Sequence, residues 1–106
     1  MPHAKLDLFS EKIVSLAEFA KALSHPARIQ IITFLHQHGP CACSEIVAHI
    51  PLSQPSVSRH LTSLKEAELV KEQARGNAIF YSLQEKKIQQ FCEAFSQTLK
   101  PQSIES

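Results

Sequence analysis

Apolar residues recur at spacings of three and four along most of the chain, and this period predicts amphipathic helices. The helices are expected over residues 6–23, 25–38, 42–50 and 85–99. The second is apolar over more than one stripe, which places it in the core. The first helix has a stripe formed by Phe9, Ile13, Leu16, Ala17, Ala20 and Leu23. The last has a stripe formed by Ile88, Phe91, Cys92, Phe95 and Leu99.

Serine, proline and glycine mark where the predicted helices begin and end. Ser24 occupies an N-cap position before the second helix, and Pro26 lies in its first turn, where a missing N–H is tolerated. Gly39 ends that helix. Ser53 is a suitable N-cap for a further helix over residues 53–67, with Pro55 confined to its first turn. The segment from about residue 42 to residue 67 therefore predicts two helices joined by a short turn.

After residue 68 the pattern changes to a period of two, which predicts strands over residues 69–74 and 78–83. Between them, Arg75, Gly76 and Asn77 are residues that suit the positive φ of a hairpin turn. A helix-turn-helix followed by a β-wing is expected from this order. The predicted fold class is mainly α with a small β-hairpin, a winged helix-turn-helix, in a single domain over residues 1–106. The helix-turn-helix would span about residues 42–67 and the wing about residues 69–83.

The helix predicted over residues 53–67 has one apolar face and one polar face. Val57, Leu61 and Leu64 recur at i, i+4 and i+7 and would pack against the domain. The polar face comprises Ser56, Arg59, Thr62 and Ser63, flanked by Gln54 and Ser58. Short polar and cationic side chains can approach base edges in the major groove, where arginine pairs with guanine and glutamine with adenine. A solvated surface helix is the alternative, but the short helix before it and the basic hairpin tip at Arg75 favour DNA binding.

Composition and charge add little to this picture. The chain has 106 residues, of which 43% are hydrophobic and 20% charged, and these values suit one folded domain. A net charge of +1 is weak support for a nucleic-acid partner. In the segment expected to bind DNA, the lysine and arginine residues are interleaved with glutamates. The prediction of double-stranded DNA as partner therefore depends on the residue pattern and not on total charge.

The sequence also predicts what the protein lacks. It contains no run of about 20 apolar residues and no signal-like amino terminus, so we expect a cytoplasmic protein with no membrane partner. Three cysteines suggest reduced thiols. Neither a glycine-rich phosphate loop nor a convincing nucleophile–base set is present. We therefore expect no enzymatic activity, no small-molecule substrate and no required cofactor.

Three segments carry a resemblance to the ArsR/SmtB family of metal-responsive repressors: LSHPARIQII, LSQPSVSRHLTSLKEAELV and RGNAIFYSL. The similarity spans about residues 21–83. It implies a homodimeric winged-helix repressor of operator DNA, with the first and last helices, about residues 6–23 and 85–99, at the dimer interface. Carried over by position, the implied DNA-binding residues are Gln54, Ser56, Ser58, Arg59 and Arg75, with His60 as a further candidate.

The same resemblance suggests an inducer. Cys41 and Cys43 begin the third predicted helix, where the family has a thiolate pair that senses soft metal or metalloid ions such as arsenite, cadmium or zinc. Soft ions select thiolates, and the helix N-terminus is expected to lower the pKa of the thiols. A third cysteine common in arsenic-type sites is replaced by Ile46. Its role would fall to Cys92 or to the partner's His3, although for Cys92 we favour a packed interface position, because it lies on the apolar stripe of the last helix.

Other interpretations of these residues stay open. His36 and His38 precede the cysteine pair as a zinc-like pattern, but side chains two apart on a helix do not share a face, and we expect exposed cations near the helix C-terminus. Cys41 and Cys43 could instead be two small residues at a helix start. The same repressor could also respond to thiol oxidation or persulfidation, or the winged helix could serve as a protein-interaction module.

Overall fold

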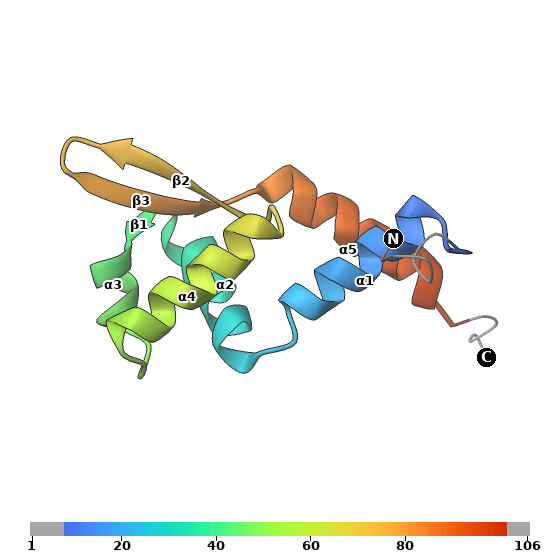
Figure 1. Ribbon diagram of the computed structural model, residues 1–106, viewed down its shortest axis with the longest axis horizontal. Helices are drawn as coiled ribbons and strands as arrows, with labels where there is room; N and C mark the ends of the chain where they lie inside the picture. The colour runs from blue at the N-terminus through green and yellow to red at the C-terminus, as the bar shows by residue number, and fades with distance from the viewer. Residues whose placement is uncertain (1–7, 102–106) are drawn as a thin grey trace.

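The computed structural model describes residues 8–101, which form a mainly helical fold with a small antiparallel sheet (Figure 1). The elements in chain order are α1 (Glu11–Ala22), α2 (Pro26–His38), β1 (Cys41–Ala42), α3 (Cys43–Val47), α4 (Gln54–Glu66), β2 (Val70–Arg75), β3 (Ala78–Leu83) and α5 (Glu85–Leu99). This order confirms the predicted winged helix-turn-helix. The bounds of α2, α4 and α5 lie within one residue of those expected.

Side-chain caps determine where α1 and α2 begin. The Ser10 hydroxyl accepts a hydrogen bond from the Ile13 backbone N–H at 3.2 Å, so α1 begins at Glu11 and not at residue 6 as predicted. The cap of α2 is His25, whose Nδ1 accepts from the Ala27 N–H at 3.0 Å. The predicted cap, Ser24, instead donates its hydroxyl to the carbonyl of Lys21, which belongs to the preceding helix.

The predicted helix over residues 42–50 begins within one residue of α3 but extends beyond its end. Cys41–Ala42 forms β1, which pairs antiparallel with β3 so that Cys41 faces Tyr81, and α3 ends at Val47. The sheet has the strand order β1-β3-β2. A strand of two residues shows no period of its own, and it forms here because the edge of β3 offers hydrogen-bond partners.

The core lies between α2, α3, α4 and the sheet. The predicted inner face of α4 is confirmed, since Val57, Leu61 and Leu64 are at most 1% exposed. Burial of each such side chain contributes about 1.5–3 kcal/mol. The other fully enclosed side chains are Ile31, Ile46, Leu69 and Val70.

Helices α1 and α5 lie side by side at the end of the molecule opposite the hairpin (Figure 1). Phe19 joins them, because its ring packs against those of Phe91 at 4.5 Å and Phe95 at 5.4 Å between centroids. The predicted stripe of α1 is therefore only partly correct. Phe19 was not in it, whereas two of its members, Phe9 and Ile13, are 56% and 49% exposed. The helix has two apolar sides, and residues 8–101 cover one of them, the side of Phe19.

Candidate nucleic-acid interface

Helix α4 presents a polar surface to solvent because its apolar side is fixed in the core. Gln54, Ser58, Arg59 and Thr62 are exposed, while Ser56 and Ser63 are half-buried. The helix starts after Ser53, whose hydroxyl accepts a hydrogen bond from the Ser56 N–H at 3.3 Å. The amino-terminal turn therefore keeps further backbone N–H groups available for an anion such as a phosphate.

Arg59 is held in position along this surface. One of its terminal nitrogens, Nη2, donates a hydrogen bond to the Ser56 hydroxyl at 3.3 Å, and Ser53 donates to the same oxygen at 3.1 Å. A guanidinium has five N–H donors in a fixed plane, so one bond to Ser56 leaves enough for a bidentate contact with a base or phosphate. The arrangement pre-orients a cation on the exposed side of α4.

His60 faces the domain more than solvent. Its Nδ1 accepts a hydrogen bond from Nε of Arg28 at 3.2 Å, and its ring lies 4.5 Å from that of His25. Burial lowers the pKa of His60, and electrostatic interactions with His25, Arg28 and Arg59 lower it further. His60 thus connects α4 to the start of α2. The sequence does not indicate this contact, because its partners lie far back in the chain, and a DNA contact by His60 stays a prediction.

The wing is a β-hairpin, in which β2 and β3 are joined by a two-residue turn. Arg75 faces Ala78 across the turn, and Gly76 has a φ of +60°, a conformation that glycine adopts without strain. The guanidinium of Arg75 lies 4.7 Å from the centre of the Phe80 ring, a cation–π contact that keeps it at the tip. Figure 1 shows the hairpin extending away from α1 and α5. Arg75 is exposed there, as a DNA contact requires.

The two cysteines of the expected sensor differ from each other. Cys41 is 4% exposed, and its Sγ donates to the Gly39 carbonyl at 3.3 Å, whereas Cys43 is half-buried at the first position of α3. Burial raises the pKa of both thiols, and the Glu45 carboxylate raises that of Cys41 further. The expected lowering of the thiol pKa is therefore wrong. Cys41 lies in β1 and not in the helix, and α3 is too short to offset the loss of solvation.

Cys92, the candidate third ligand within the described residues, is not grouped with this pair. Within residues 8–101 the structure has no group of three or more His, Cys, Asp or Glu side chains placed to hold a metal ion. Cys92 is exposed on α5. The remaining candidate, His3, lies outside the described residues. The metal role of Cys41 and Cys43 therefore stays a prediction.

In the part of the chain that the structure describes, no helix combines the length and apolar character needed to cross a membrane.

Several known proteins are similar to this chain in sequence. Residues 25–72 match the family described as "Bacterial regulatory protein, arsR family". The transcriptional repressor SdpR of Bacillus subtilis is 40% identical over 63 residues, which cover 59% of this chain and 69% of that protein. An arsenical resistance operon repressor of Staphylococcus xylosus is 38% identical over 68 residues, which cover 64% of each chain.

A solved structure agrees in fold. The homodimeric winged helix-turn-helix DNA-binding domain of a Mycobacterium bovis protein has a TM-score of 0.68 and 25% identity, covering 81% of this chain and 80% of its own. The matched segment contains α2, α3 and α4, the elements that position the polar surface and the cysteine pair. Members of this family regulate transcription through DNA. With this fold and these matches, the chain belongs to the ArsR family of bacterial regulatory proteins.

Proposed function

We propose that this protein is a transcriptional repressor that binds double-stranded operator DNA as a homodimer, with α4 as its recognition helix. The observation that carries the proposal is the two-sided character of α4. Val57, Leu61 and Leu64 fix one side in the core, so the orientation of Arg59 and Gln54 on the other side is set before DNA arrives. A preorganised surface loses little conformational entropy on binding.

The polar residues of α4 would make two kinds of contact with DNA, to base edges and to phosphates. Arg59 and Gln54 would read base edges in the major groove, whereas Ser56, Ser58 and the free N–H groups of the first turn would hold phosphates. Arg75 would contact the backbone or the minor groove from the wing.

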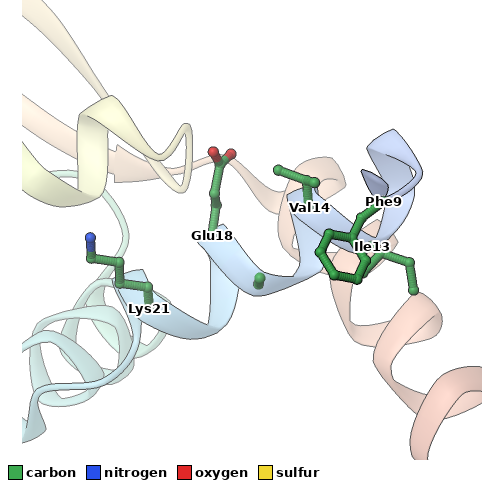
Figure 2. A pocket seen from close by; sticks show the side chains of 6 residues that line it. Phe9, Ile13, Val14, Glu18 and Lys21 are labelled. Atoms are coloured by element: carbon green, nitrogen blue, oxygen red, sulfur yellow. The ribbon is translucent and has the colours of Figure 1, made fainter. Parts of the chain in front are cut away.

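A second copy of the chain would cover the exposed apolar side of α1. Figure 2 shows Phe9 and Ile13 beside Val14 on this side, with Glu18 and Lys21 farther along the helix. Phe9 and Ile13 are 56% and 49% exposed, and Leu99 of the neighbouring α5 is 69% exposed. The M. bovis relative is homodimeric, which supports this occupant. A two-fold dimer would place its two α4 helices in successive major grooves, about 34 Å apart.

We further propose that a thiophilic ion bound by Cys41 and Cys43 releases the DNA. The S. xylosus relative is a repressor of an arsenical resistance operon, and the cysteine pair directly precedes the helix-turn-helix. Since the pKa of both thiols is raised, the ion must displace protons, and its affinity should increase with pH. The partner's His3 is the remaining candidate for a third ligand, because Cys92 is not grouped with the pair.

Operator release tests both parts of the proposal. An operator would be selected from a pool of random duplexes with the purified protein, and its complex would be titrated with arsenite, cadmium, zinc and peroxide. We expect an ion to release the wild type but not Cys43→Ala, whereas Cys92→Ser should respond as the wild type does, because Cys92 is not grouped with the pair. Release by peroxide alone would contradict the metal proposal and favour thiol oxidation or persulfidation. Absence of duplex binding at every salt concentration would contradict DNA binding itself and favour a protein-interaction module.

A further inference from the structure

Three aromatic rings meet where the end of α2 approaches the turn that follows α3. His38 is the last residue of α2, and His49 lies two residues beyond the end of α3. The ring of Phe34 lies 4.1 Å from that of His38 and 5.1 Å from that of His49, and the two imidazole centroids are 6.1 Å apart. Both histidines are exposed. The fold thus brings together two imidazoles that are eleven positions apart in the chain.

Both imidazoles are fixed in the same tautomer. Nδ1 of His38 is 3.0 Å from the carbonyl oxygen of Phe34, and Nδ1 of His49 is 3.0 Å from that of Glu45. A carbonyl oxygen can only accept, so each Nδ1 must carry the proton and donate it. In a neutral imidazole the lone pair then lies on Nε2. A backbone carbonyl that orients a histidine through its other nitrogen is the usual support of a metal ligand.

The separation of the rings is close to what one shared ion requires. When two imidazoles bind one ion through Nε2 at roughly 2.0–2.1 Å, their centroids lie about 5.2 Å apart at a tetrahedral angle and about 6.4 Å apart at a linear one. The observed 6.1 Å is nearer the linear limit. For a tetrahedral ion the two exposed rings would therefore approach each other by about 1 Å on binding. Imidazole nitrogens select divalent ions such as zinc, nickel and copper.

We propose that His38 and His49 bind one divalent transition-metal ion of this class. The two histidines would supply two ligands and water the others, because within residues 8–101 no third histidine, cysteine or carboxylate is grouped with them. The site is distinct from the Cys41 and Cys43 pair in its donor atoms, and it does not depend on the inducer proposed above. The ion would tie the end of α2 to the turn that leads into α4.

Zinc binding to the full-length protein tests the site. The titration would be followed by calorimetry and by the NMR signals of the histidine side-chain nitrogens, which report on each imidazole separately from the thiols. We expect the Nε2 signals of His38 and His49 to shift together and to saturate at one ion per chain. His38→Phe, which keeps a ring to stack on Phe34, and His49→Gln should each weaken binding at this site at least about tenfold.

His36→Gln is the matched control, because His36 is exposed in the same last turn of α2 and should leave the affinity unchanged. Thermal unfolding without zinc would verify that each variant is folded, and zinc should raise the Tm of the wild type more than that of either variant. Unmoved signals of His38 and His49 at saturating zinc would overturn the proposal. So would wild-type affinity in both variants, even if the cysteines bind zinc.

Discussion

Arg59 is the residue on α4 best placed to recognise a base. It is exposed, and its hydrogen bond to Ser56 keeps its guanidinium on the polar side of the helix. We predict that Arg59→Ala weakens operator binding by about 1–3 kcal/mol and relaxes the preference at one base pair. Fluorescence anisotropy with the operator and its single-base variants would measure both effects. An equal loss on every duplex, with a smaller salt dependence, would show a phosphate contact instead.

His60 makes stability depend on pH. Its pKa is lowered in the folded protein, while the unfolded chain has the ordinary value of about 6.5. Below that value the unfolded state takes up the proton first, so stability is kept above about pH 6.5 and decreases as pH falls through the folded pKa. Protonation would also remove the acceptor that Arg28 uses.

Urea unfolding at pH 7.5 and pH 5.5 would measure this effect. The wild type should lose more stability between the two pH values than His60→Gln, which cannot titrate. Equal losses in the two proteins would show that His60 has no part in the pH dependence.

At the scale of elements, the anchoring of α4 is the main determinant of the surface that it presents. We predict that Leu61→Ala lowers the free energy of unfolding by about 2–5 kcal/mol, because the side chain is 1% exposed and leaves a cavity. Its exposed neighbour supplies the control, since Thr62→Ala should change stability by less than about 0.5 kcal/mol. Chemical denaturation measures both. A neutral Leu61→Ala would mean that α4 packs through another face.

The helices of this fold are predictable from the sequence because their burial is periodic. The stripe of α4 determines which of its residues are exposed, so the location of the polar surface follows from the sequence. Strand β1 is not predictable, since its partner lies about forty residues later in β3. The raised pKa of the thiols cannot be predicted from the sequence for a similar reason, because burial of Cys41 depends on elements distant in the chain.

The contacts of the histidines are likewise tertiary. The sequence places His60 on a helix and His38 near a helix end, but neither position reveals Arg28 or His49 as a neighbour. His25, and not the predicted Ser24, caps α2, because a ring nitrogen can accept a hydrogen bond from a backbone N–H as a hydroxyl can. Local pattern therefore identifies the elements, and packing decides which side chains meet.

The whole molecule separates its two expected interfaces. Figure 1 shows α1 and α5 at one end, away from the hairpin and α3. We predict that Ile13→Glu raises the dimer dissociation constant at least about 100-fold, because an unpaired carboxylate buried in an interface costs several kcal/mol. The monomer should stay folded, since Ile13 is 49% exposed.

Sedimentation equilibrium and light scattering would measure the change in assembly. Ser15→Glu is the matched control, because it adds the same charge at an exposed position of α1 and should leave the dimer intact. A fully dimeric Ile13→Glu protein would place the interface elsewhere.

Strand β1 connects the helix-turn-helix to the wing. It joins the segment before α3 to β3, where Ala42 faces Phe80, and Phe80 in turn supports the guanidinium of Arg75. A displacement of Cys41–Ala42 would thus be transmitted in two directions, through α3 towards α4 and along β3 towards the hairpin tip. If α4 and the wing both bind DNA as proposed, one shift of this strand would disturb both contacts together.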